Sequence, residues 1–182
     1  MNILDCVTYF DEEIILNLRL NILYEHVSKF IITEGAYDHR GNKRKLNFNI
    51  KKFEKFKDKI IYILKKDIPF DIEEISESDN ENEHYRKSIF NASKRENLQR
   101  NQILDGLKDL EPNDWVIISD LDEIPNLENV DFYNIKNKFL FFQQSMMYYK
   151  FNLKLDNFTW TGSRACKFKY LRSPQWLRNI KT

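Results

Sequence analysis

The amino-acid sequence predicts an α/β fold with a mostly parallel central sheet, helices on both faces and an antiparallel C-terminal extension. Two observations carry this prediction. Strand-like and helix-like segments alternate up to residue 125 and strand-like segments follow, an order that favours parallel strands joined by helical crossovers. The chain has 182 residues and no internal repeat, so we expect a single domain over residues 1–182.

The first two elements are predicted by an apolar stretch and an acidic turn. Ile3 to Phe10 predicts a strand, and Asp11 to about Glu25 predicts a helix because acidic residues favour a helix N-terminus. The expected apolar face of this helix consists of Ile14, Leu18 and Ile22, with Ile15 and Leu23 beside them. Arg19 lies within the otherwise apolar neighbourhood L-R-L. The pattern is compatible both with a surface arginine whose stem covers apolar atoms and with a functional arginine.

The next segments continue the alternation. Lys29 to Thr33 predicts a second strand, and Glu34 follows at its carboxyl end. The loop from Tyr37 to Lys45 carries four basic residues, which suit either phosphate binding or a solvated surface. A short helix from Asn49 to Asp58 and a third strand from Lys59 to Leu64 are expected after it.

An acidic block and a long helix lie in the middle of the chain. Residues 67–83 carry acidic side chains and no Lys or Arg, which favours a mobile, solvated loop. The following segment, His84 to Leu107, predicts a helix of several turns. The middle of its expected buried face is polar, from Arg95 to Asn101, and such a conflict is typical of functional sites. The alternative is that the expected face is misplaced by one residue.

The segment from Trp115 to Pro125 is an apolar run that ends in carboxylates. Trp115 to Ile118 predicts a buried strand. Asp120 and Asp122 follow two residues apart, so an extended chain would point both carboxylates to one side. Hard oxygen ligands at a strand end suit Mg²⁺ or Mn²⁺ bound together with substrate phosphates. Ordinary turn chemistry before Pro125 explains the acidic residues equally well at this point.

The C-terminal third is expected to contain mainly strands. We predict a short helix from Leu127 to Ile135, an aromatic strand from Phe139 to Tyr149, and a hairpin from Phe158 to Lys169 around Gly162 and Ser163. These strands form the expected antiparallel extension of the sheet.

Composition limits the partners and the location of the protein. The formal net charge of +1 gives no general attraction to nucleic acid. Two cysteines make no disulfide framework. No apolar run has the length of a membrane span, and the N-terminus lacks the basic lead of a signal peptide. We therefore expect a soluble, cytoplasmic protein with no transmembrane segment.

Several motifs in one order along the chain resemble glycosyltransferase family 17, the family of β-1,4-mannosyl-glycoprotein 4-β-N-acetylglucosaminyltransferase. The residues that carry the resemblance are D-C-V-T-Y-F-D-E-E (5–13), L-R-L-N-I-L (18–23), F-I-I-T-E-G (30–35), the loop 41–45, R-E-N-L-Q-R-N (95–101), I-I-S-D-L-D-E-I-P (117–125), W-T-G-S-R (160–164) and S-P-Q-W-L-R (173–178).

The resemblance implies a GT-A-like nucleotide-diphosphosugar transferase fold and an inverting, metal-assisted transfer. The expected donor is UDP-GlcNAc, the acceptor is a glycan, and the cofactor is a divalent metal, Mn²⁺ or Mg²⁺. The expected site residues are Asp120 and Asp122 as metal ligands, Glu123 as catalytic base, Glu34, Arg95, Arg100 and Asn101 at the donor, and Trp160 and Arg164 at the acceptor.

Two other functions remain open on the sequence. Proteins of the family continue past S-P-Q-W-L-R, so we expect this chain to lack the family's C-terminal part. A non-catalytic remnant that binds sugar nucleotides or glycans is the first alternative. A phosphohydrolase with Asp120 as nucleophile is the second, although Ile124 stands where such enzymes place Thr or Val.

Overall fold

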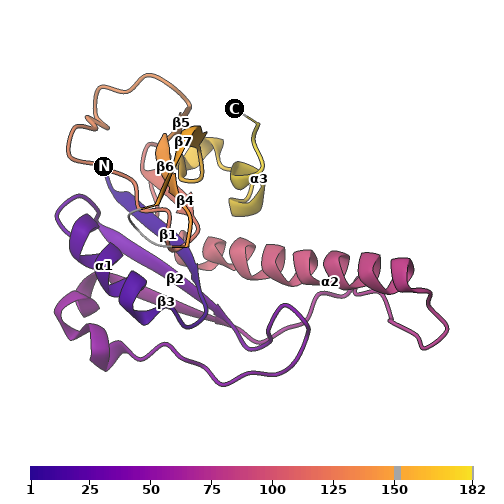
Figure 1. Cartoon of the computed structure of the whole chain (residues 1–182). Coiled ribbons are helices and arrows are strands. Elements are labelled where there is room, and N and C mark those ends of the chain that lie inside the picture. Colours follow the sequence, from indigo (N-terminus) through magenta and orange to yellow (C-terminus); the bar gives the residue numbers. More distant parts are fainter. Residues whose placement is uncertain (150–152, 182) are drawn as a thin grey trace.

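The computed structural model describes residues 1–149 and 153–181. In this part of the chain six strands form one sheet in the order β3-β2-β1-β4-β8-β5 (Figure 1). Four neighbouring strands are parallel: β1 (Ile3–Tyr9), β2 (Lys29–Gly35), β3 (Ile60–Lys65) and β4 (Trp115–Ser119). β8 (Arg164–Lys167) is antiparallel to β4, and β5 (Phe139–Phe141) is antiparallel to β8. The predicted α/β fold with a mostly parallel sheet is confirmed.

Both faces of the sheet are covered because successive residues of its strands point to opposite sides. On one face, Val7, Ile32 and Ile117 pack against helix α1 (Glu13–Leu23) and the 3₁₀ segment η1 (Ile50–Lys59). On the other, Cys6, Ile31 and Val116 join residues of two further elements, one in the middle of the chain and one near its C-terminus. These elements are η2 (Gln102–Gly106) and α3 (Pro174–Arg178), and a further 3₁₀ turn, η3, spans Phe168–Tyr170. The continuous apolar runs of the strands reflect this two-sided burial.

Helix α2 (Glu81–Asn101) extends far beyond the sheet (Figure 1). Its N-terminus is closed by a capping box between Asn80 and Glu83. Asn91 is buried, and its side chain exchanges two hydrogen bonds with the backbone of Glu73. The acidic segment before the helix is therefore attached to α2, and ion pairs such as Glu73–Arg86 add to this attachment.

Strands β6 (Gln144–Met147) and β7 (Lys154–Trp160) form a separate antiparallel ribbon. Ser145 pairs with Thr159, whereas Met147 pairs with Lys154. These two pairs are two residues apart in β6 but five residues apart in β7. Asn157, within the longer stretch of β7, adopts a positive φ of 59°. The extra residues make β7 bow away from its partner.

Two predictions for the C-terminal third are wrong. The expected hairpin from Phe158 to Lys169 does not form, because β7 pairs with β6 whereas β8 pairs with β4 and β5. Gly162 and Ser163 lead the chain from one sheet to the other. The aromatic strand expected over residues 139–149 is divided into β5 and β6; residue 150 and the two after it lie outside the described residues.

The helix expected from Leu127 to Ile135 is also wrong. The side chains of Asn126 and Asp131 accept hydrogen bonds from backbone N–H groups two residues ahead, at Glu128 and Tyr133. These local bonds form turns that compete with helix formation. Leu127 and Phe132, which belong to this segment of turns, have buried side chains.

The face predicted for α1 is wrong as well. The buried residues of the helix are Leu16, Arg19, Leu20 and Leu23, whereas Ile14 is 83% exposed. The expected series Ile14, Leu18 and Ile22 faces outward, and the side that faces the sheet includes Arg19. It is the polar centre of the buried face, since the neighbouring strand supplies an acidic partner for it.

Candidate active site

The loop after β4 takes its shape from Arg19. The guanidinium group of Arg19 forms a two-pronged ion pair with Asp5 of β1, with N–O distances of 2.6 and 2.7 Å, and both side chains are fully buried. Its Nη1 atom donates to the carbonyl oxygens of Asp120, Leu121 and Glu123, each at 3.1 Å. A single buried cation therefore holds three carbonyl oxygens of the loop over residues 120–123 in place.

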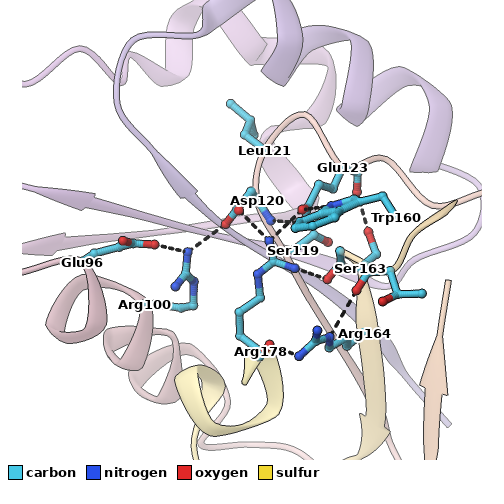
Figure 2. Close-up of polar contacts among 12 residues, drawn as sticks. Glu96, Arg100, Ser119, Asp120, Leu121, Glu123, Trp160, Ser163, Arg164 and Arg178 are labelled. Atoms are coloured by element: carbon cyan, nitrogen blue, oxygen red, sulfur yellow. Dashed lines mark hydrogen bonds and ion pairs between the residues drawn. The ribbon is translucent and has the colours of Figure 1, made fainter. Parts of the chain in front are cut away.

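Asp120 stands between two arginines from different helices (Figure 2). Arg100 of α2 donates to its Oδ1 at 2.8 Å, and Arg178 of α3 donates to its Oδ2 at 2.6 Å. Burial disfavours the charge on Arg178, but Asp120 and Glu123 outweigh it and raise the pKa of this side chain. Asp120 thus joins α2 to α3 across the end of β4.

Glu123 lies beside this pair and is almost fully buried. Its Oε1 accepts hydrogen bonds from the Trp160 indole at 2.6 Å and from Arg178 at 2.7 Å, and its Oε2 accepts one from the backbone N–H of Asp120. A Cβ atom added at Gly162 would lie 2.1 Å from Oε1. Glu123 therefore joins the loop to the β6–β7 ribbon, and the space around it requires glycine at position 162.

A cleft of about 470 Å³ opens beside the loop. Its walls are the end of β1, α2 and the loop after β4, and they include Tyr9, Gln99, Arg100, Asp120 and Asp122. The carboxyl ends of parallel strands meet at this edge, where α/β proteins bind their ligands. The volume lies within the range of small-molecule sites.

Arg100 is the most notable cation in the wall of this cleft. Its side chain is only 4% exposed, and it is also paired with Glu96 at 2.7 Å. Its Nε–H has no hydrogen-bond partner in the described part of the chain, and the same is true of the buried Nε–H of Arg95. Buried donors without a partner are rare in folded proteins. The wall of the cleft therefore contains a cationic side chain with one unpartnered, buried donor, and its positive charge suits an anionic ligand.

Asp122 is the carboxylate most available for a metal ion. It is exposed at the cleft. Loss of water around the carboxyl raises its pKa, and the charges of Glu123 and Asp120 raise it further. No cluster of three or more metal-binding side chains exists among the described residues. Each oxygen of Asp120 already accepts a hydrogen bond from an arginine, and its side chain is 40% exposed.

The other predicted donor residues lie in different surroundings. Glu34 is fully buried; its oxygens accept from the backbone N–H groups of Asn47 and Phe48 and from the Tyr62 hydroxyl, and Arg44 pairs with it. Arg95 binds the carbonyl oxygen of His39 beside the cleft. Asn101 accepts from the backbone N–H of Gln175 and so connects α2 to α3.

The predicted acceptor residues flank Glu123. Trp160 is 37% exposed and is held by its hydrogen bond to Glu123. Arg164 donates to carbonyl oxygens at the end of α3, those of Leu177 and Arg178. Burial and the nearby charge of Arg178 lower the pKa of Arg164.

Sequence reasoning missed Arg178 and Gly162. Arg178 ends the S-P-Q-W-L-R motif and Gly162 lies in W-T-G-S-R, so both positions were noticed without a role. Their spatial relation to Asp120 and Glu123 depends on long-range packing of α3 and the ribbon, which no local pattern carries. For Arg19 a signal existed in the charge within L-R-L, and Asp5 within the first strand was its complement.

Comparison with known proteins gives one match. The family model described as glycosyltransferase family 17 matches residues 1–176. No curated protein and no solved structure matches the chain. None of the helices in residues 1–149 and 153–181 has the length and hydropathy needed to cross a membrane.

Proposed function

Because the chain belongs to glycosyltransferase family 17, we propose that it is an inverting transferase with a GT-A type fold. The donor is a nucleotide-diphosphosugar, with UDP-GlcNAc as the expected compound, and the acceptor is a glycan. The donor lies in the cleft between the end of β1, α2 and the loop after β4. The position of the cleft at the carboxyl ends of parallel strands supports this placement.

The observation that carries the proposal is the state of Arg100. This guanidinium lies in the wall of the cleft with an unused Nε–H. A diphosphate offers anionic oxygens that match a guanidinium in charge and geometry. Arg95, with its own unused Nε–H, lies five residues earlier on the same helix and lines the neighbouring hollow. Together they provide donors for the phosphates and stabilise the negative charge that develops on the leaving group.

The carboxylates at the cleft fit a divalent ion that arrives bound to the sugar nucleotide. Mg²⁺ and similar ions are usually held by one or two carboxylates together with substrate phosphates. Asp122 is exposed at the cleft, and its pKa is raised first by loss of water and then by the negative charges of Glu123 and Asp120, which a bound cation would offset. In the proposal Asp122 is the principal protein ligand and Asp120 the second. The ion would act as a Lewis acid on the diphosphate leaving group.

Glu123 and Glu34 take positioning roles in this proposal. The Glu123 carboxylate has hydrogen bonds at both oxygens and orients Trp160 and the backbone of Asp120. Glu34 fixes the loop at Asn47 and Phe48 beside the cleft. For Glu123 to act as the catalytic base expected from the family resemblance, it would first have to release Trp160 or Arg178.

A second candidate function is binding of a sugar nucleotide without transfer. The engagement of Glu123 favours it, because the cleft then lacks a free carboxylate at the position where a base was expected. The two functions share the donor cleft. Only the transferase would convert the sugar nucleotide to products.

Calorimetry with UDP and Mn²⁺, combined with an assay for hydrolysis of UDP-GlcNAc, tests both candidates without a known acceptor. We expect UDP to bind and Arg100→Met to lower the affinity about 10- to 100-fold, as expected for lost hydrogen bonds from a charged group. Arg172→Met, which removes an exposed arginine, is the matched control. Absence of UDP binding by the wild type contradicts the proposal. Binding without turnover of any nucleotide sugar supports the second candidate.

A further inference from the structure

The β6–β7 ribbon carries a second hollow that the donor cleft does not include. Its volume is about 460 Å³, and it lies between the two strands and the residues that precede β6. It exists because β7 has extra residues opposite β6, so that the longer strand bows outward around Asn157. The residues that line it and enter the argument are Gln143, Gln144, Ser145, Asn157, Phe158 and Thr159.

The side chains that line this hollow are suited to binding hydroxyl groups. Three of the side chains are carboxamides and two carry hydroxyl groups, and each of these groups can donate and accept hydrogen bonds. Sugar hydroxyls have the same double capacity. No carboxylate lines the hollow, and Lys154 is its single charged residue. A neutral ligand rich in hydroxyl groups fits this lining better than a phosphate or a cation.

Most of these polar groups are unused. Gln143, Ser145, Asn157 and Thr159 are exposed, and in the described part of the chain their side chains make no hydrogen bond. Gln144 is the exception: its amide donates to the Ile124 carbonyl and accepts from the Ser163 N–H. In the hollow, the side chain of Gln144 is therefore held in place by hydrogen bonds, whereas the other four polar side chains are available to a ligand.

Two aromatic rings extend from the hollow toward the candidate active site. Phe158 lines the hollow, and its ring stacks with that of Trp160 at a centroid distance of 6.4 Å and an interplanar angle of 22°. Trp160 is hydrogen-bonded to Glu123. Aromatic faces of this kind suit the C–H faces of sugars. The Phe158–Trp160 pair therefore links the lining of the hollow to Glu123, which follows Asp122 in the sequence.

We propose that the hollow on the β6–β7 ribbon is a binding groove for a neutral oligosaccharide, the part of the acceptor glycan next to the sugar that is modified. The assignment to an acceptor rests on the proposed transferase function. The inference that a saccharide binds here rests only on the residues that line the hollow. Amide and hydroxyl groups bind the sugar hydroxyls, and Phe158 and Trp160 support the ring faces.

Saturation-transfer NMR with chitotetraose, cellotetraose and mannotetraose tests the groove on the intact chain in the absence of nucleotide. We expect at least one of them to bind the wild type. The double variant Gln143→Ala/Asn157→Gly removes two free carboxamides, and glycine retains the positive φ at position 157. We expect its affinity to be about tenfold lower, corresponding to two lost hydrogen bonds. Phe158→Ala should weaken binding independently.

The matched control is Asn129→Ala/Asn137→Ala, which removes two exposed carboxamides elsewhere on the surface and should bind like the wild type. Failure of all three saccharides to bind overturns the proposal, and so does equal binding by the groove variants. UDP calorimetry on the same samples separates the two proposals. Saccharide binding without UDP binding retains the groove and removes the transferase function, whereas UDP binding without a groove effect removes the groove alone.

Discussion

At the scale of single residues, the candidate site depends on charges that are buried behind it. Arg19 and Asp5 do not line the cleft, yet their ion pair fixes the backbone that presents Asp120 and Asp122. Such a pair contributes little net stability compared with apolar residues, but breaking it leaves an uncompensated charge in the interior. The shape of the loop is therefore sensitive to position 19.

We expect Arg19→Leu to lower the free energy of unfolding by about 3–5 kcal/mol, because Asp5 would remain as a buried, unpaired carboxylate. Urea unfolding followed by circular dichroism measures this loss. Arg40→Leu, at an exposed arginine, is the control and should stay within about 0.5 kcal/mol of the wild type. A loss below about 1 kcal/mol for Arg19→Leu would show that the pair does not hold the loop.

Gly162→Ala tests the crowding around Glu123. The new Cβ atom would lie 2.1 Å from Glu123 Oε1 and 2.3 Å from Trp160 Nε1, so the indole must leave its carboxylate partner. We expect a shifted tryptophan fluorescence spectrum. If the proposed function holds, turnover of the donor should fall about 100-fold, the effect of a misplacement near 1 Å. An unchanged spectrum with full turnover would contradict the crowding.

Residue patterns predicted the position of the carboxylates but not their partners. Asp120 and Asp122 follow a buried strand as expected, because an apolar run and its polar end are local features. The arginine contacts of Asp120 come from residues 20 and 58 positions away. Glu34 follows the expected strand too, yet its carboxylate turns inward to backbone donors that lie 13 and 14 residues further along. Local sequence does not specify such contacts.

At the scale of elements, strands were easier to predict than helix faces. β1, β2 and β4 have apolar runs that are buried on both faces, so their prediction does not depend on choosing a face, whereas β3 at the edge of the sheet is only partly buried. The apolar face expected for helix α1 was wrong, since the side that is buried includes a charged residue, Arg19, and an apolar pattern does not identify such a side. The Phe158–Lys169 hairpin failed because strand pairing is decided by the whole sheet and not by the turn alone.

The contact that attaches the acidic segment to α2 can be tested directly. We expect Asn91→Ala to lower the free energy of unfolding by about 1–3 kcal/mol, because both backbone groups of Glu73 lose their partner. Amide hydrogen exchange should rise in residues 67–79.

Lys94→Ala is the comparison for Asn91→Ala. It removes a partly exposed ion pair with Asp71, and pairs of this kind contribute about 0–1 kcal/mol. If the two variants destabilise equally, the buried amide is not the main attachment.

At the scale of the whole molecule, the N-terminus is joined to the strand that carries the candidate site. Asp114, just before β4, accepts hydrogen bonds from the backbone and side chain of Asn2 and from the backbone of Glu111. Burial acts to raise the pKa of Asp114, but these hydrogen bonds outweigh it and lower the pKa below the ordinary value of an aspartate. The contact connects residues 112 positions apart.

This contact makes the stability of the fold depend on pH. A carboxyl whose pKa is lower in the folded state stabilises the fold above its ordinary pKa, and the contribution is lost as the pH falls through the folded value. We expect Asp114→Ala to cost about 1–3 kcal/mol at pH 7 and less at pH 3, by urea unfolding. Asp109→Ala removes an exposed carboxyl as control. An equal cost at both pH values would contradict the ionic character of the contact.

The anchoring by Arg19 limits how the D-L-D-E segment can be transplanted. Its backbone conformation is imposed by a side chain from α1, which is in turn held by Asp5 on β1. Grafting residues 120–123 onto another scaffold would transfer the carboxylates without their geometry. A graft that retains the site must carry the end of β1, the first two turns of α1 and the end of β4 as one unit, so the smallest portable module is tertiary and not a sequence motif.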